Sequence, residues 1–144
     1  MNHPELAGKI EQLGFYLKYD ACLPRPVFQF IVLSMAARYK VAFEWVDHVA
    51  PARAAGLPEA VIQSLIDDNP SALPSEFSVI ARAMDAILSY RSLPSALQDI
   101  RLYQTKGLIE IVTLCGFHQL IGVINQSFDV PLPEGAADPF AKKG

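Results

Sequence analysis

The segment from about Pro26 to Tyr39 is apolar on almost every side, and this property constrains the fold more than any other. A helix that is apolar all round has no face to turn toward water, so it is expected at the centre of a domain. Pro26 suits the first turn of such a helix. Gln29 is then a polar residue in a position that we expect to be buried. The apolar residues are Val27, Phe28, Phe30, Ile31, Val32, Leu33 and Met35.

Helical patterns dominate the rest of the chain as well, and strand patterns are weak. Apolar residues recur at helical spacing, proline and glycine separate the segments, and the short connections favour antiparallel neighbours. We therefore expect an all-α fold, a compact bundle of about six to seven helices. The expected helices are Pro4–Tyr19, Pro26–Tyr39, Val41–Ala55, Glu59–Asp67, Ser75–Tyr90, Leu93–Tyr103 and Lys106–Phe128.

The length of 144 residues suits a single domain, with a core at about 5–135 and a tail at 136–144. The formal net charge is −3 and no basic cluster is present, which argues against a nucleic-acid partner. Hydrophobic residues make up 51% of the chain and charged residues only 19%. We attribute this balance to apolar surface buried between the subunits of a homo-oligomer.

The compartment and the cysteine chemistry follow from what the sequence lacks. We find no apolar run of bilayer-spanning length and no signal peptide, so we expect a cytoplasmic protein with no membrane partner. Cys22 and Cys115 lie far apart and without Cys-x-x-Cys spacing. Neither a disulfide framework nor a zinc site is therefore expected.

Glu44 and His48 are four residues apart within an expected helix, so their side chains share one face. Most of the surrounding helical sequence is apolar, and a proton-handling pair against an apolar wall is typical of an acid–base site. The alternative is a solvated pair on a helix face, worth roughly 0.3–0.5 kcal/mol. Pro51 is expected to kink this helix just beyond His48.

Several short motifs follow one another in a specific order over most of residues 5–135. In chain order they are Leu23-Pro24-Arg25-Pro26, Phe28–Ala37, Phe43–His48, Ala52–Leu57, Gly107–Val112, Phe117-His118, Asn125 and Val130–Gly135. This order resembles the carboxymuconolactone decarboxylase family, whose members have the alkylhydroperoxidase D-like fold. The resemblance implies an all-helical protein that assembles as a trimer, a hexamer or a related homo-oligomer.

The resemblance also implies one of two chemistries. The decarboxylase branch needs no cofactor and removes CO₂ from a lactone carboxylic acid. The peroxidase branch uses a Cys-x-x-Cys-x-x-x-His motif together with an acidic residue on the preceding helix. Within that motif His48 matches the histidine, Glu44 and Val41 replace the two cysteines, and Gln29 replaces the acid. A thiol peroxidase needs a thiolate nucleophile, so this sequence disfavours that branch.

We therefore expect a cofactor-free lyase that acts on a small carboxylated lactone or a related small molecule. His48 would act as the acid, and Glu44 would orient it and raise its pKa. Gln29 cannot titrate, but it could donate to a developing oxyanion or hold His48. Arg38 could bind a substrate carboxylate. Trp45 and His118 complete the expected substrate-binding residues.

Each of these residues also has a structural interpretation. Trp45 could be a core or interface residue, His118 a buried residue with its hydrogen bonds satisfied, and Arg38 a cation at the end of a helix. A metal site formed by Glu44, His48 and His118 has too few ligands to be expected. The main alternative to the enzyme is a non-catalytic, oligomeric binding member of the fold, in which Glu44 and His48 form a structural pair.

Overall fold

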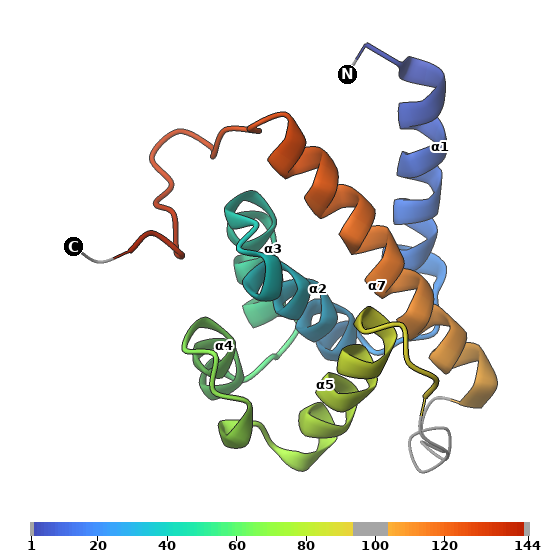
Figure 1. Ribbon diagram of the computed structural model, residues 1–144, viewed down its shortest axis with the longest axis vertical. Helices are drawn as coiled ribbons and strands as arrows, with labels where there is room; N and C mark the ends of the chain where they lie inside the picture. Colours follow the sequence, from blue (N-terminus) through green and yellow to red (C-terminus); the bar gives the residue numbers. More distant parts are fainter. Residues whose placement is uncertain (1, 94–103, 143–144) are drawn as a thin grey trace.

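The computed structural model describes residues 2–93 and 104–142 of the chain. These residues form an all-helical bundle of six α-helices with no strand, which confirms the expected fold class (Figure 1). The short helix expected at about Leu93–Tyr103 falls on residues 94–103, which lie outside the described residues. The helices are α1 (Pro4–Phe15), α2 (Arg25–Tyr39), α3 (Ala42–Ala54), α4 (Glu59–Ile66), α5 (Ser75–Leu88) and α7 (Gln104–Ser127).

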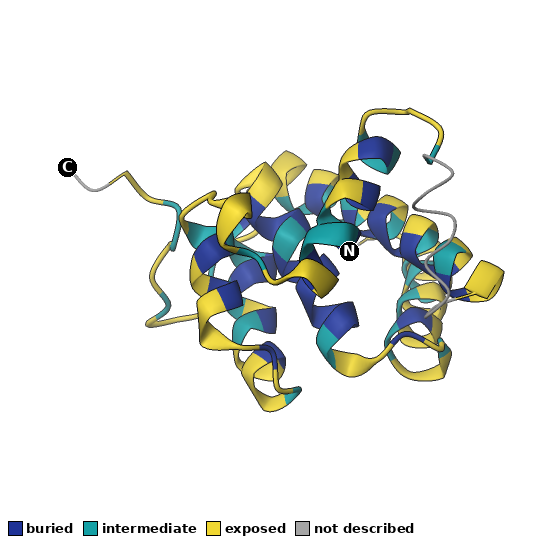
Figure 2. Cartoon of the chain, turned by 90° about the horizontal axis from the view of Figure 1, so that it is seen from below, coloured by how far each residue is buried: buried dark blue, intermediate teal, exposed yellow. Residues whose placement is uncertain are grey.

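Helix α2 runs through the middle of the bundle, as its apolar sequence predicts (Figure 1). It packs against α3, α4, α5 and α7, and ten of its fifteen residues are buried. Each large apolar side chain buried in this way stabilises the fold by about 1.5–3 kcal/mol. Figure 2 shows that the buried residues gather on the inward faces of the surrounding helices. Gln29 is buried among them, with 1% of its surface exposed.

The boundary between α2 and α3 is a tight turn that sets the two helices side by side. Lys40 adopts the left-handed conformation, with φ of 55°, and its N–H is directed to the last carbonyls of α2. Helices commonly end in this way, with a single residue at positive φ after the last helical turn. Helix α3 then begins at Ala42 and returns along α2. Pro51 lies inside α3, one turn beyond the segment that carries Glu44 and His48.

Helix α7 is the longest helix, and it differs from one sequence expectation. Its 24 residues contain an 18-residue window with a mean hydropathy of 1.7, so the helix is long and apolar enough to cross a membrane by length and composition. The prediction that no run reaches this length is therefore wrong. A long helix in the core of a protein can meet the same criteria of length and hydropathy. Seven residues of α7 are buried, including Glu110 and His118. The Glu110 carboxylate accepts a hydrogen bond from the backbone N–H of Cys22 at 2.8 Å, which ties the 21–24 connection to α7.

Helix α1 stands at the edge of the molecule beside α7, and none of its residues is buried (Figures 1 and 2). It continues into a π-helical turn, Tyr16–Asp20, whose Leu17 is buried in the core. Gly14 lets α1 approach α7 closely, because a Cβ atom there would lie 2.9 Å from Cζ of Phe117. The contact between Gly14 and Phe117 places α1 as an outer wall on this side of the bundle.

The C-terminal segment folds back onto the chain that carries it. The Phe140 ring packs edge-on against the Trp45 ring, with 5.7 Å between the ring centroids, and the Lys40 ammonium lies 5.2 Å from the Phe140 centroid. The sequence suggests a loose tail or one held by Phe140 on a neighbouring subunit. In the structure Phe140 binds within its own chain.

Candidate functional site

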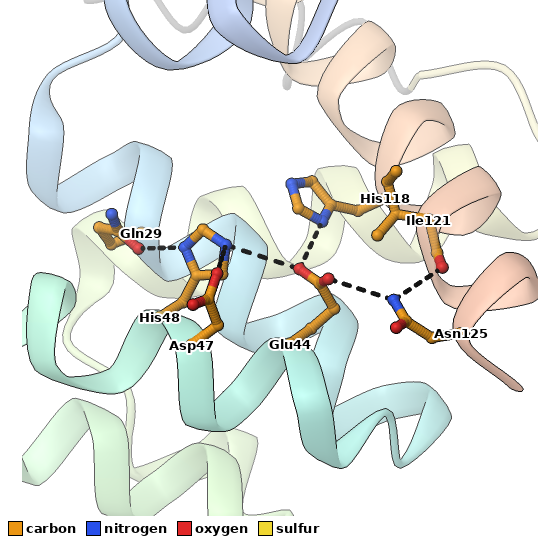
Figure 3. A network of polar contacts seen from close by, with 7 residues as sticks. All are labelled: Gln29, Glu44, Asp47, His48, His118, Ile121 and Asn125. Atoms are coloured by element: carbon orange, nitrogen blue, oxygen red, sulfur yellow. Dashed lines mark hydrogen bonds and ion pairs between the residues drawn. The ribbon is translucent and has the colours of Figure 1, made fainter. Parts of the chain in front are cut away.

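The Glu44 and His48 side chains meet on one face of α3, as their spacing predicts. His48 Nε2 lies 3.5 Å from Glu44 Oε2, and each residue has only 8% of its surface exposed (Figure 3). The pair is therefore not the solvated helix-face pair of the alternative interpretation. At this burial a proton between the two side chains is held by the protein rather than by bulk water.

Gln29 reaches the other nitrogen of the same imidazole from α2. Its Oε1 lies 3.2 Å from Nδ1 of His48. An amide oxygen only accepts hydrogen bonds, so Nδ1 is the protonated nitrogen in this arrangement. The neutral His48 ring then presents an unprotonated Nε2 to Glu44. One titratable proton remains for the pair, carried either by the Glu44 carboxyl or by Nε2.

Two side chains of α7 contact the Glu44 carboxylate from the side opposite His48. His118 Nδ1 lies 3.7 Å from Oε2, and the Asn125 amide donates to Oε1 at 3.2 Å (Figure 3). Asn125 also donates to the backbone carbonyl of Ile121 at 3.0 Å, which holds the amide in place. Gly122 makes this approach possible, because even a Cβ atom there would lie 3.3 Å from a Val41 methyl group.

Burial sets the charge state of Glu44. It raises the pKa of the Glu44 carboxyl to about 7, the negative charge of Asp47 adds to the rise, and the hydrogen bond from Asn125 opposes it. Glu44 is therefore protonated in a substantial fraction of molecules near neutral pH. A protonated carboxyl can donate to Nε2 of His48, which matches the tautomer that Gln29 selects.

The two histidines are held neutral. Burial lowers the pKa of His48, with Asp47 opposing this shift and the positive charges of Lys18 and Arg25 adding to it. Burial also lowers the pKa of His118, to about 3. The sequence predicts that Glu44 raises the pKa of His48. The structure gives the opposite direction, because the loss of hydration outweighs the stabilisation of the imidazolium.

A pocket of about 410 Å³ gives a small molecule access to this pair. Its floor is formed by α3 and α7, and its outer wall by α1 and the π-helical turn. Most of the lining is apolar, which matches the general character of small-molecule sites. Polar lining residues are Glu11, Lys18, Glu44, Asp47, His48 and His118, and the rings of Phe15, Tyr19, Phe28 and Phe117 form much of the rest.

Of the residues that the sequence predicts for the site, Glu44, His48 and His118 line this pocket. Gln29 lies behind His48 rather than in the lining, so in the structure it holds the imidazole and does not face the pocket as an oxyanion donor. Trp45 is buried against Phe140 and is also outside the lining, which makes it a core residue.

Arg38 is not brought to this pocket, and the structure corrects its expected role as the carboxylate anchor. Its guanidinium pairs with Asp85 of α5 at 2.7 Å, and it lines a different cavity. The physical reason is the helix geometry. Arg38 follows Gln29 by nine residues, which is about 13 Å along α2 and half a turn around it.

From the sequence alone, neither Asn125 nor Asp47 has an expected role in the site. Asn125 follows His118 by seven residues, which is two helical turns, so this spacing was the available signal. The Asp47 side chain is exposed, yet its carboxylate lies 3.7 Å from Nε2 of His48. The contribution of the π-helical turn has no local signal, because it depends on how α1 docks on the bundle.

Other chemistries find less support in the described part of the chain. Within it, no three His, Cys, Asp or Glu side chains are arranged to hold a metal ion. Neither cysteine lines the pocket, and burial raises the pKa of the Cys115 thiol to about 12, which disfavours a thiolate there. Comparison with protein families, curated proteins and solved structures gave no match to this chain.

Proposed function

We propose that this protein is a cofactor-free acid–base enzyme of carboxymuconolactone decarboxylase type. In this proposal it removes CO₂ from a small carboxylated lactone or a related compound, and Glu44 and His48 are its catalytic residues. The observation that carries the proposal is the buried Glu44–His48 pair, whose Oε2 and Nε2 atoms lie 3.5 Å apart, which is held from behind by Gln29 and opens into a pocket of about 410 Å³.

The proposed reaction replaces the lost CO₂ with a single proton on the same conjugated system. The C–C bond to the substrate carboxylate breaks, CO₂ leaves, and the bonding electron pair moves into the conjugated lactone carbonyl as an enolate. The carbon then takes the proton held between Glu44 and His48, and the pair regains a proton from water. General acid catalysis of this kind contributes roughly 10²–10⁴-fold to a rate. It is most effective when the pKa of the acid lies near the working pH, and the pKa of Glu44 is about 7.

His118 and Asn125 support this role from α7. In the proposed cycle Glu44 becomes an anion after it has released its proton. The Asn125 amide then donates to that carboxylate, and the neutral His118 limits the access of water on the same side. The Asn125 hydrogen bond stabilises the Glu44 anion without adding a formal charge to the pocket, whereas the exclusion of water keeps the pKa of Glu44 high.

The proposed assembly is a homo-oligomer, and the surface of α7 supports it. Four apolar side chains of α7 are exposed and recur at intervals of three, eight and three residues, which places them along one face. They are Ile109, Val112, Leu120 and Val123. A single chain seldom leaves such a stripe in water. Sedimentation analysis of the wild type and of Val123→Glu tests the proposed homo-oligomer. An oligomeric wild type that the substitution dissociates would support it, and a monomeric wild type would rule it out.

A turnover assay tests the proposed reaction directly. Purified protein is incubated with a carboxymuconolactone, and CO₂ release is followed at neutral pH. We expect His48→Ala to lower the rate by roughly 10²-fold or more. His3→Ala is the matched control, because His3 is an exposed histidine outside the pocket lining. Equal rates for wild type and His48→Ala would remove His48 from the mechanism.

A non-catalytic binding protein is the competing function, and the same assay separates the two. The buried pair would also suit a purely structural role if no cavity reached it. The pocket beside Glu44 and His48 favours the enzyme instead. A wild type that binds carboxylated lactones without releasing CO₂ would favour the binding protein.

A further inference from the structure

We infer that the π-helical turn Tyr16–Asp20 forms the anion-binding end of this pocket, with Lys18 as the residue that binds a substrate carboxylate and Arg25 as its support. The inference rests on the proposed function, since it assigns the carboxylate anchor that Arg38 does not provide. The chemical class is a small, flat, unsaturated ring that carries a carboxylate. Three features of the described residues lead to it.

The first feature is the position of Lys18. It is half-buried, it lines the pocket together with Glu44 and His48, and its charge acts on His48. The π-helical turn inserts one extra residue per turn, which rotates the following side chains relative to a regular helix; such turns are frequent at functional sites. Leu17 anchors the turn in the core, so Lys18 is presented from a fixed piece of backbone.

The second feature is that these cations have no carboxylate partner. Across residues 2–93 and 104–142, neither Lys18 nor Arg25 forms an ion pair within 4.0 Å, whereas Arg38 and Arg53 do. Arg25 donates instead to the backbone carbonyl of Lys18, which ties it to the same turn. Two neighbouring cations without an acidic partner, at the edge of an apolar pocket, favour an anionic ligand.

The third feature is the aromatic surface around the two cations. The Lys18 ammonium lies 5.3 Å from the centroid of the Tyr19 ring, and the Arg25 guanidinium lies 5.0 Å from that of Phe28. Both rings line the pocket. A flat unsaturated ring could pack on these faces while its carboxylate reaches Lys18 and its reacting carbon points toward His48.

Two acidic residues also line the pocket and limit where the anion can lie. Glu11 is on α1, and Asp47 is beside His48, 3.7 Å from its Nε2. A carboxylate near Asp47 would meet a like charge. The Lys18 end is therefore the favourable position for the carboxylate, and the uncharged part of the ligand is left beside Glu44 and His48.

A binding titration tests the inference without requiring turnover. The probe is 2-furoate, a flat ring with one carboxylate, and its neutral counterpart is 2-furamide. Binding to the full-length protein is followed by ¹H–¹⁵N chemical shifts. We expect wild type to bind 2-furoate roughly tenfold more tightly than 2-furamide, the ratio that one charge-assisted hydrogen bond provides. In Lys18→Met this preference should disappear, and in Lys18→Arg it should be retained.

Lys9→Met is the matched control, because Lys9 is an exposed lysine of α1 outside the pocket lining. It should keep the full preference for 2-furoate, and circular dichroism melting should confirm that both methionine variants are folded. The inference is overturned if wild type does not bind 2-furoate at millimolar concentrations. It is equally overturned if Lys18→Met binds 2-furoate as tightly as Lys9→Met does.

The binding test and the turnover test can fail separately. A wild type that binds 2-furoate through Lys18 but releases no CO₂ from a carboxymuconolactone would keep the anion site and remove the proposed function. If turnover depends on His48 but the preference for 2-furoate does not depend on Lys18, the proposed function is kept and the anion site at Lys18 is removed.

Discussion

The Oε1 atom of Gln29 lies 3.2 Å from Nδ1 of His48, in the interior of the bundle where α2 and α3 meet (Figure 3). An amide at this position does not titrate, so it keeps the same hydrogen bond at every pH. An acidic residue in its place would carry a second proton. Gln29 therefore restricts the proton chemistry of the site to Glu44 and His48.

Removing the Gln29 amide should weaken both the fold and the orientation of His48. Gln29→Leu leaves the Nδ1–H of a buried imidazole without an acceptor, which costs about 1–3 kcal/mol in the free energy of unfolding. Urea denaturation measures this loss. Nitrogen chemical shifts of the His48 ring should show a mixture of the two neutral tautomers in the variant, compared with the Nδ1–H form in wild type.

Gln29→Glu is the complementary variant, because it keeps an acceptor and adds a charge. A buried carboxylate 3.2 Å from Nδ1 stabilises the imidazolium and should raise the pKa of His48 relative to wild type. An NMR titration of His48 checks the direction. If the pKa of His48 were unchanged in Gln29→Glu, the contact between the two side chains would not exist in solution.

Glu44 should make the protein less stable as the pH rises toward neutrality. The pKa of Glu44 is raised from its ordinary 4.5 to about 7, so between these values the folded state binds a proton that the unfolded state has lost. Stability from this group is complete below about pH 4.5 and is lost as the pH rises to about 7. The full change is about 3 kcal/mol.

The variant Glu44→Gln isolates this effect. It cannot titrate, so the difference in unfolding free energy between wild type and variant should decrease as the pH rises from about 4.5 to 7. His48 and His118 both have pKa values lowered by burial and give the opposite slope, with stability lost as the pH falls below their ordinary 6.5. That slope is present in both proteins and cancels in the difference. A difference that stays constant with pH would contradict the raised pKa of Glu44.

The fold follows from the sequence because its signals are local. The apolar segment around Phe30 and Ile31 could only be a central helix, and proline or glycine separates most of the segments. Five of the six described helices agree with the expected ones to within about two residues at each end; the first, expected to run to Tyr19, is α-helical only to Phe15 and continues as the π-helical turn Tyr16–Asp20. The expectation about membrane-spanning length is the exception, because α7 combines a half-buried core helix with an exposed apolar face in one long segment.

The candidate site follows from the sequence only in part. The contact between Glu44 and His48 needs nothing beyond helix periodicity, and it was predicted. Arg38 was assigned to the same site although helix geometry already places it on the other face of α2 from Gln29. Lys18 could not be found, because its place in the pocket depends on the docking of α1 against Phe117, a contact between segments about one hundred residues apart.

The docking of α1 should depend on Gly14, and Gly8 provides a matched comparison in the same helix. Glycine to alanine in a helix interior stabilises it by up to about 1 kcal/mol. A Cβ atom at Gly8 meets nothing within 4 Å, so Gly8→Ala should raise the melting temperature. A Cβ atom at Gly14 would lie 2.9 Å from Phe117 Cζ, so Gly14→Ala must displace the ring or the helix.

We therefore expect Gly14→Ala to be less stable than Gly8→Ala and to bind 2-furoate more weakly, since Phe117 and α1 both line the pocket. Thermal melts followed by circular dichroism, together with the chemical-shift titration, measure the two effects. Equal stability and equal binding for the two variants would show that α1 does not rest on Phe117 in solution.

The last prediction concerns the contact between Phe140 and Trp45. Trp45 is the only tryptophan of the chain, so the tryptophan fluorescence comes from this residue alone. Phe140→Ala removes an edge-on ring 5.7 Å from the indole and exposes one side of it to water. The emission of Trp45 should shift to longer wavelength, and the segment that follows α7 should be cut faster by a protease. The aromatic contact itself contributes about 0.5–1.5 kcal/mol.

Phe128→Ala is the control, because Phe128 is an exposed phenylalanine for which no ring contact with Trp45 is seen among the described residues. An unchanged emission in Phe140→Ala would mean that the tail does not cover Trp45 within its own chain and would restore the alternative that Phe140 binds a neighbouring subunit.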